Sequence, residues 1–498
     1  MLQLLKYTIQ NIIRKKYILK STVLLIASGT FYSCNKNELN LYPETTLTEG
    51  LFYNTETQLI QAVNDSYRQL EKIYDAGGIA DIYGELGSDN VYIKAVSGAN
   101  SWPEDINLHK IRPDNGKLEA AWNAAYNGIF IINNVITHLE NTEVEFSTAG
   151  LKERLIAEAK SIRALIYYNL VQVWGGVPFP LKVVSAQESY GYLREKKETI
   201  LSLLVTDLTE AQANLPESYT GTDIGRITKY GAVAILARVY LAQDDDTKAA
   251  QALKSIIDSN RYSLDANGDG SINKTDYAHL FQANTKNSKE AIVEVQYLAG
   301  QNQVNSTHQA EYAPWDFSFH LPGSTITFRG NGLNTPADDL INEYEAEDPR
   351  KDISLATGFT DLQTGNFIAY PYTLKFYDPN YLYPGQNVEI IRYADILLLY
   401  AELTGEVSYL NQVRNRVGLP VYGEAAYPSA DYPTVALAVE HERRVELAFE
   451  FHRFFDLVRT GRAVAVLQSK GIDITSGELL FPIPQAVIDT NPEITQNP

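Results

Sequence analysis

Apolar residues recur at helical spacing along most of this chain, and this pattern constrains the fold more than any other feature of the sequence. Ile391, Ala394, Leu398 and Ala401 are three or four residues apart, as on one face of an amphipathic helix. Residues 151–174 contain apolar side chains at the same spacing. The chain is therefore expected to be mainly α-helical.

The predicted helices form pairs joined by turns. Residues 230–242 and 247–257 flank a short acidic turn, and their alanine-rich sequence resembles a tetratricopeptide-type hairpin. The other predicted pairs are 120–139 with 151–174, 199–215 with 230–242, and 392–403 with 407–417. Because repeated hairpins bury their apolar faces only by stacking on neighbours, we expect a partly solenoid helical platform.

Residues 292–384 have a different texture. They are rich in Asn, Gly, Pro, Thr and Tyr and contain few long apolar periods, which predicts loops and short strands laid over the helices. A length of 498 residues would by itself suggest about three domains. No linker is evident in the sequence, so one compact unit is favoured.

The balance of charge restricts the possible partners. The chain has 61 acidic and 42 basic residues and a net charge of −19. Nucleic-acid binding needs a concentrated basic surface, so the composition argues against a nucleic-acid partner.

Cys34 is the only cysteine, which excludes an intrachain disulfide. Residues 1–33 contain five basic residues and no acidic residue, and the apolar run 21–31 follows the basic cluster, as in a secretory signal. That run is about half of the roughly 20 residues that span a bilayer, so cleavage is expected. Cys34 then resembles the lipid-modified first residue of a bacterial lipoprotein, the alternative being a free buried cysteine.

Four segments of the chain carry a family resemblance. They are 158–178, which ends in Trp-Gly-Gly-Val-Pro; 392–402 with 410–420; 442–461; and 480–485 with 491–498. Together, behind a lipoprotein-type signal, they resemble the SusD/RagB family of surface lipoproteins from Bacteroidetes nutrient-uptake systems, over essentially the whole mature chain. Two departures from the family pattern are a short turn between Tyr400 and Leu410 and a weakly acidic segment, Asn35-Lys36-Asn37-Glu38.

The resemblance implies an architecture and a role. It implies a signal peptide at 1–33 and a SusD-like domain at 34–498, with an amino-terminal part at about 34–220 and a carboxy-terminal part at about 290–498. It also implies a lipid-anchored protein of the outer membrane that faces the cell surface. Such a protein captures oligosaccharides without catalysis and delivers them to a SusC-like TonB-dependent transporter. The RagB branch leaves peptides open as the alternative cargo.

The family segments themselves predict scaffold rather than a catalytic centre. Gly175-Gly176 allows a left-handed helix end, and the prolines that follow prevent the helix from resuming. Arg443, Glu446 and Glu450 fall at helical spacing, which predicts charge pairs within or between helices. A catalytic carboxylate pair is the alternative interpretation of the two glutamates.

Residues 265–276 match the loop pattern of an EF-hand, which predicts a bound calcium ion. Calcium prefers six to eight oxygen ligands, and Gly270 permits the sharp turn such a loop needs. The predicted ligands are Asp265, Asn267, Asp269, Ser271, Asn273 and Asp276. The pattern also resembles a dockerin loop, of which only one copy is present. An ion-free turn rich in Asn, Gly and Asp is the alternative.

The common catalytic motifs are missing from the sequence. His441-Glu442 is followed by Val445 where a metalloprotease needs its second histidine. The sequence has no Gly-x-Ser-x-Gly elbow, phosphate-binding loop or cysteine nucleophile. A surface hydrolase is therefore the weakest functional hypothesis.

Two aromatic clusters are candidates for sugar contact. A sugar stacks its C–H face on an aromatic ring while its hydroxyls need amide, carboxylate or guanidinium partners, and such residues belong on loops. Asn100 and Trp102 lie in one polar stretch, and Tyr312, Trp315 and Phe317 lie in another. The other two tryptophans, at positions 122 and 174, are expected in the core because they fall within predicted helices.

Overall fold

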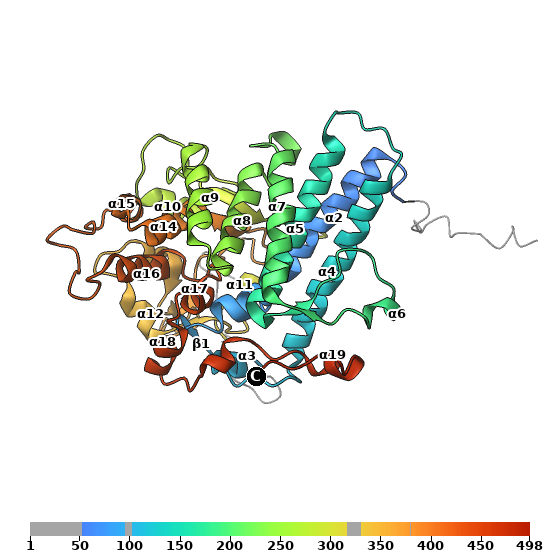
Figure 1. Cartoon of the computed structure of the whole chain (residues 1–498). Helices are drawn as coiled ribbons and strands as arrows, with labels where there is room; N and C mark the ends of the chain where they lie inside the picture. Colours follow the sequence, from blue (N-terminus) through green and yellow to red (C-terminus); the bar gives the residue numbers. More distant parts are fainter. Residues whose placement is uncertain (1–51, 95–101, 316–329, 379) are drawn as a thin grey trace, which may run out of the picture. The chain divides into compact units, whose positions relative to one another are not determined.

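The chain is mainly helical within the residues that the computed structural model describes, which are 52–94, 102–315, 330–378 and 380–498. The prediction of a mainly α-helical fold is confirmed (Figure 1). Cys34 and the predicted signal lie outside the described residues. Residues Asn54–Pro498 form one compact unit.

The amino-terminal helices pack in the order of the chain. They are α2 (Glu56–Tyr74), α4 (Gly116–Asn141), α5 (Leu151–Trp174), α7 (Lys197–Asn214), α8 (Lys229–Ala242) and α9 (Asp246–Asp258). Each contacts the next, so consecutive antiparallel pairs build one continuous platform (Figure 1). The five helices from α4 to α9 confirm the predicted ones to within four residues at each end.

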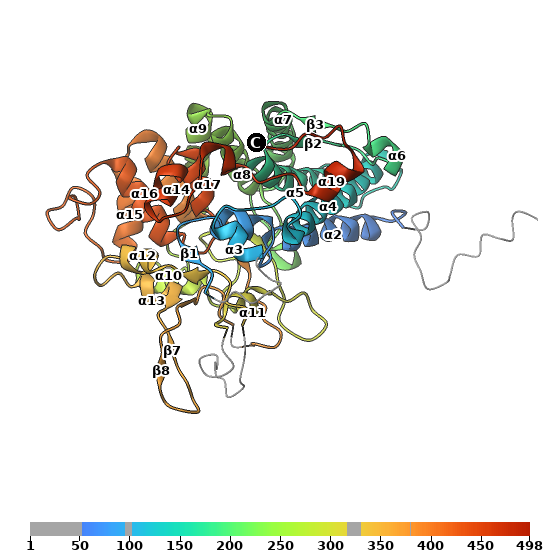
Figure 2. The same ribbon diagram turned by 90° about the horizontal axis from the view of Figure 1, so that it is seen from below.

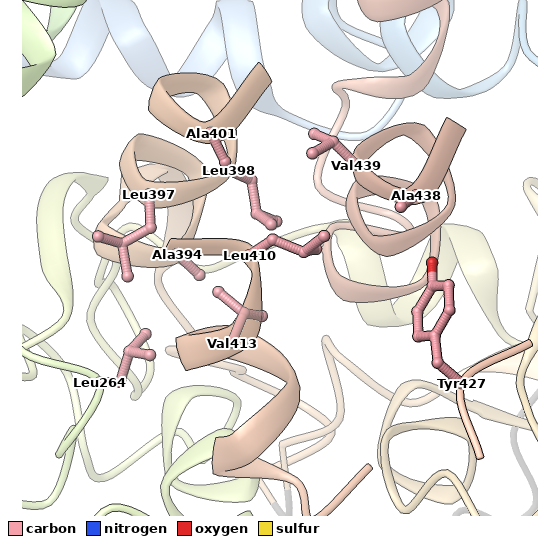
Figure 3. Close-up of a cluster of buried hydrophobic side chains, with 10 residues drawn as sticks. All are labelled: Leu264, Ala394, Leu397, Leu398, Ala401, Leu410, Val413, Tyr427, Ala438 and Val439. Atoms are coloured by element: carbon pink, nitrogen blue, oxygen red, sulfur yellow. The ribbon is translucent and has the colours of Figure 1, made fainter. Parts of the chain in front are cut away.

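The carboxy-terminal helices continue this platform. Helix α14 (Tyr393–Thr404) packs against α9, α15 (Val407–Arg416) and α16 (Val435–Glu446). Figure 3 shows the apolar cluster between them, in which Leu397, Leu398 and Leu410 are fully buried. Gly405 ends α14 in the left-handed conformation, with φ of 73°, so the short turn still closes the predicted α14–α15 hairpin.

The region predicted to be irregular contains short strands and also short helices. The longest strands, β4 (Ala291–Val295) and β10 (Val388–Arg392), pair antiparallel. The other antiparallel pairs in the described residues are β1 (Val91–Tyr92) with β5 (Thr335–Pro336), β2 (Val177–Pro178) with β3 (Arg194–Glu195), β6 (Leu355–Ala356) with β9 (Tyr372–Thr373), and β7 (Phe359–Thr360) with β8 (Phe367–Ile368). Figure 2 shows the β7–β8 hairpin extending away from the helices.

Short helices connect these parts. They are the π-helix η1 (Asp81–Glu85), α3 (Trp102–Asn107), α6 (Ala186–Ser189), η2 (Gly221–Asp223), α10 (Lys274–Leu280), α11 (His308–Tyr312), α12 (Asp338–Glu343), α13 (Arg350–Ser354), α17 (Arg453–Arg459), α18 (Ala463–Ser469), η3 (Ser476–Leu479) and α19 (Gln485–Thr490). Helix α17 packs against η1, so a segment from the last part of the sequence contacts one from the first part. No helix among the described residues is long and apolar enough to cross a membrane.

The carboxy-terminal tail closes the end of α5. Trp174 is fully buried, and its indole N–H donates to the carbonyl of Pro482 at 3.0 Å. The Asn497 amide donates to the carbonyl of Trp174 at 3.1 Å. Trp122 meets Trp174 edge to face at 5.1 Å, so the core positions predicted for both tryptophans are confirmed.

Charged side chains from distant segments meet in the core between β4, β10 and α16. Arg392 donates to Glu290 at 2.6 Å, to Glu446 at 2.5 Å and to Glu450 at 2.7 Å. All four side chains are at most 3% exposed. Arg350 and Arg416 also bind Glu446. This cluster, the buried ion network, is balanced by charges of both signs, as buried ions require.

Arg443, Glu446 and Glu450 each form charge pairs, as predicted. Their partners lie on other elements of the chain, and the three residues do not pair with one another. Helix α16 ends at Glu446, and Phe449 and Phe451 take left-handed φ values of 66° and 65°. Glu450 is therefore not on the helix.

Candidate functional site

Trp315 forms an exposed aromatic position on the irregular face. Its side chain is 36% exposed. Gly332 approaches it so closely that an added Cβ would lie 3.3 Å from the Cβ of Trp315 and 2.6 Å from the hydroxyl of Tyr370. The Lys94 ammonium lies 4.1 Å from the centre of the Tyr370 ring. Trp315 thus stands close to Tyr370 across Gly332, and Tyr370 in turn carries a cation against its ring, groups suited to sugar contact.

A cluster of buried side chains rich in tyrosine packs around the segment that leads to Trp315. Tyr370 and Tyr372 are buried there with Phe359 of strand β7 and Ala313, which follows α11. On the β7–β8 hairpin itself, Phe367 is 63% exposed. The hairpin and the end of α11 therefore share one apolar base, which holds the segment that leads to Trp315.

Trp102 is the first residue of α3 and is partly buried. The Lys117 ammonium lies 4.9 Å from the centre of its ring. An added Cβ at Gly77 would lie 3.6 Å from the ring and 2.9 Å from the ammonium, so this glycine, with φ of 74°, leaves room for both side chains. Trp102 is therefore a half-buried ring with a cation against it.

Asp81 connects the surroundings of the two tryptophans. Its carboxylate accepts from the Gly77 amide at 2.7 Å and from the Asn334 side chain at 2.5 Å. Gly77 lies against Trp102, and Asn334 follows Gly332, which lies against Trp315. Burial raises the pKa of Asp81 to about 6. One buried carboxylate therefore positions the backbone beside each ring.

The prediction that Tyr312 is a surface contact is wrong in this structure. Tyr312 is 2% exposed and packs edge to face on His308 and Phe376. Burial raises the pKa of its hydroxyl, and the Asp81 carboxylate raises it further. The sequence could not reveal this burial because Tyr312 lies in a short polar stretch. The predicted contacts Asn100 and Phe317 lie outside the described residues.

The predicted calcium loop is ordered by its own hydrogen bonds. Asp265 accepts from the amides of Asp269 and Gly270 at 3.1 and 3.0 Å. Asp276 accepts from the amides of Asn267 and Asn273 at 3.2 and 2.8 Å. Gly270 takes φ of 89°, the left-handed turn expected of it.

Other features of the calcium loop bear on its ligands. Asn273 caps α10, which places Asp276 in the first helical turn. Ser271 precedes this helix, and its backbone amide donates to the Asp269 carboxylate at 2.8 Å. No cluster of three or more His, Cys, Asp or Glu side chains suited to a metal occurs in the described part of the chain. The structure thus brings the residues of the predicted loop together in one turn, and the binding of calcium there stays a prediction.

The glutamates considered as a catalytic pair lie within the buried ion network. Glu446 is fully buried, and although burial opposes it, Arg416, Arg392 and Arg350 hold the pKa of Glu446 well below its usual range. Glu450 is held by Arg392 and by Lys375 at 2.6 Å. Each carboxylate is thus engaged by buried cations, so the pair has a structural role.

A separate cavity of about 690 Å³ lies against α4, α6 and α19. Phe130 on α4 is 49% exposed and Tyr190 is 48% exposed at its wall. Of the predicted contacts that the structure describes, Trp102, Tyr312 and Trp315, none lines this cavity. Phe130 therefore provides an exposed aromatic side chain outside the predicted site.

Two family models match the chain. One, described as "SusD family", matches residues 369–473. The other, described as "Starch-binding associating with outer membrane", matches residues 39–241. The amino-terminal and the carboxy-terminal parts of the chain thus each match a model of SusD-type proteins. The segments that carry the family resemblance predict the same order of parts.

The chain belongs to the SusD/RagB family.

Relatives and solved structures agree with this assignment. A SusD-like protein of Formosa agariphila is 25% identical, and the match covers 91% of this chain and 94% of the relative. A SusD-like protein of Bacteroides ovatus is 24% identical over 89% of this chain and 83% of its own length. A solved structure named laminarin binding SusD-like protein has a TM-score of 0.76 and 25% identity, over 90% of this chain and 100% of that chain.

A further solved structure shares the fold. It is the surface glycan-binding protein A from Bacteroides thetaiotaomicron in complex with laminarihexaose, with a TM-score of 0.73 and 22% identity over 89% of this chain and 99% of that one. These names describe SusD-like and carbohydrate-binding proteins and no enzyme. The prediction of a non-catalytic SusD/RagB protein is confirmed by these relatives.

Several side chains at the tryptophans were not predicted from the sequence. Asp81 on η1 and Lys94, which follows β1, reach the site only through the fold, because their partners Asn334 and Tyr370 are far along the chain. Lys117 on α4 comes against Trp102 of α3, the helix that precedes it in the chain. The glycine at 332 offered the one local signal, since a Gly330-Asn-Gly332 turn indicates close backbone approach.

Proposed function

We propose that this chain is a non-catalytic lipoprotein of the outer membrane that binds oligosaccharides and delivers them to a TonB-dependent transporter. The observation that carries the proposal is the exposed side chain of Trp315, set close to Tyr370 across Gly332 and linked through Asp81 to the surroundings of Trp102. Aromatic faces with adjacent cations and hydroxyls suit the alternating apolar and polar surface of a sugar.

The relatives point to a ligand class for the first test. The laminarin-binding SusD-like protein is similar over nearly the whole described chain, which makes a β-glucan oligosaccharide the first ligand to examine. The family description that names the outer membrane supports the proposed location. Lipidation at Cys34 would tether the protein there, and two acyl chains are enough for stable anchoring.

Replacing Trp315 with alanine is expected to weaken laminarihexaose binding at least tenfold, because stacking on a large ring is lost. Trp102→Ala is expected to act in the same direction. Retention on an array of neutral oligosaccharides, followed by calorimetry, measures both. Phe130→Ala removes an exposed ring elsewhere and is expected to leave binding unchanged.

Two outcomes would contradict this assignment. If both tryptophan variants bind every retained oligosaccharide as the unchanged protein does, the tryptophans are not the site. If the protein retains a pool of peptides and no glycan, the cargo is peptide, as the RagB branch of the family allows. Equal melting temperatures for all variants are required for either conclusion.

We also propose that the loop at 265–276 binds one calcium ion that orders the segment before α10. Calcium added to chelator-treated protein is expected to raise the melting temperature, because an ion that binds only the folded state stabilises it by about 2.7 kcal/mol at a 100-fold excess over Kd. Asp265→Asn is expected to abolish the shift, while Asp246→Asn, outside the loop, keeps it. Absence of both heat and a melting shift at millimolar calcium would reject the ion.

A further inference from the structure

Two adjoining cavities lie on either side of the segment that connects α7 to α8. Their volumes are about 350 and 270 Å³. Ile224, Gly225, Arg226 and Glu294 line both of them, so the connecting segment forms a ridge between two halves of one depression. We call this depression the connector trough. Volumes of this size are typical of small-ligand sites.

Three tyrosine rings form walls of the connector trough, and the protein fixes each of them. Tyr219 and Tyr262 line the larger cavity, and Tyr67 lines the smaller. The hydroxyls of Tyr219 and Tyr67 donate to the two oxygens of Glu158 at 3.1 and 2.9 Å. The Tyr262 hydroxyl bonds to the Thr228 hydroxyl at 3.2 Å. All three residues are partly exposed, and Arg154 and Arg226 lie over one face of the Tyr219 and Tyr67 rings, so the aromatic surface left to a ligand is pre-positioned.

The floor of the trough is polar and equally fixed. The Glu294 carboxylate accepts from the Asn287 amide at 3.0 Å and from the Asn387 side chain at 2.6 Å. The Gln296 side chain donates to the Asn287 side chain at 3.0 Å. Amide and carboxylate groups thus meet at Glu294 of strand β4 and on the segments beside it, and they include both donors and acceptors.

Gly225 gives the trough its depth. It takes φ of 96°, and an added Cβ would lie 2.7 Å from the side-chain amide carbon of Gln296. The ridge therefore lies directly against Gln296 on the floor, at a position where a residue with a side chain does not fit. Arg226 is held on the ridge by Glu158 at 2.9 Å and by Asn64 at 2.7 Å.

The lining selects a class of ligand. Arg226 and Arg261 are matched by Glu217 and Glu294, so the trough has no single sign of charge that would attract a polyanion or a polycation. Fixed polar groups make up much of the lining of the larger cavity, while apolar side chains such as Leu70 and Val295 line part of the smaller one. Fixed rings above fixed donors and acceptors suit a neutral, polyhydroxylated ligand.

We propose that the connector trough is a second saccharide-binding site of this protein, formed by different elements from those that hold Trp102 and Trp315. The inference rests on the proposed function in that the same glycans are expected to reach both sites. A long glycan held at two separate places would gain avidity without any new contact.

The test fills the trough without disturbing the fold. Ser218 is exposed at its wall, so Ser218→Trp is expected to obstruct the larger cavity. Ser429→Trp places the same ring at an exposed position that does not line the trough and serves as the matched control. Both variants are made in the full mature chain and in Trp102→Ala/Trp315→Ala protein. The probes are hexasaccharides of β-glucan, α-glucan, xylan and mannan, with a peptide pool as the alternative.

The proposal predicts that Ser218→Trp weakens the binding of at least one of these hexasaccharides tenfold or more in both backgrounds. Ser429→Trp is expected to change the affinity for none of them. Unchanged affinity for every hexasaccharide in Ser218→Trp would overturn it, as would retention of the peptide pool alone or of no probe by the unmodified protein. The unmodified protein separates the two failures: if it retains no hexasaccharide, the proposed function itself fails, whereas a retained hexasaccharide whose affinity Ser218→Trp leaves unchanged overturns the trough alone.

Discussion

Replacing Arg392 with methionine is expected to lower the free energy of unfolding by about 3–5 kcal/mol, because it leaves buried carboxylates without their cation. Arg392 alone bridges Glu290, Glu446 and Glu450 in the buried ion network. Its removal leaves only Arg350, Arg416 and Lys375 among the described cations to balance these acids. Urea unfolding followed by circular dichroism measures the change.

The matched control for this prediction is Arg112→Met. Arg112 pairs with Asp114 at the surface, where both side chains are more than half exposed, and its replacement is expected to leave the midpoint of urea unfolding unchanged. Arg392→Lys keeps the charge but loses the guanidinium fork, so an intermediate loss is expected. If Arg392→Met and Arg112→Met unfold at the same urea concentration, the network is not a major source of stability.

Replacing Gly84 with alanine is expected to lower the free energy of unfolding by at least about 3 kcal/mol, because a Cβ has no space at this position. Gly84 lies in η1, and the added Cβ would stand 2.7 Å from the carbonyl carbon of Phe451 and 3.0 Å from the Phe455 ring. The obstacle is backbone, and Phe451 also donates its amide to Glu85 at 3.3 Å, so the neighbour cannot move easily.

Gly116→Ala is the control for this substitution. Gly116 begins α4, and nothing lies within 4 Å of the position its Cβ would take. A small gain of about 0.4–1 kcal/mol is expected, since alanine restricts the unfolded chain more than glycine does. Because η1 also carries Asp81, Gly84→Ala is expected to weaken glycan retention as well. Equal stability of the two variants would show that η1 and the Phe451 segment separate readily.

The sequence predicts best what depends on neighbouring residues. The helices from α4 to α9 and the α14–α15 hairpin follow from apolar spacing within each segment, and their observed ends agree with the predicted ones. The break between α16 and α17 could not be predicted in this way. It depends on Phe449 and Phe451, whose left-handed backbone is accommodated by contacts with η1, more than 360 positions earlier.

The candidate site was predictable in part, for the same reason. Trp315 stands out as an aromatic residue in a loop-rich region, and the structure places it at the surface. Tyr312 has the same local signal and is buried, because its neighbours His308 and Phe376 come together only in the fold. The connector trough left no sequence signal, since its walls come from α2, the segment before α8, and β4.

The contacts between the carboxy-terminal tail and α5 bear on the order in which the protein is assembled. Val173, Trp174 and Arg194 lie in the first half of the chain, yet their backbone or side-chain partners are at positions 481–497. The early helices therefore complete their core only after the last of these residues has been synthesised. Removal of the tail is therefore expected to uncover Trp174 in the first half of the chain, although its partner Pro482 lies 308 positions later.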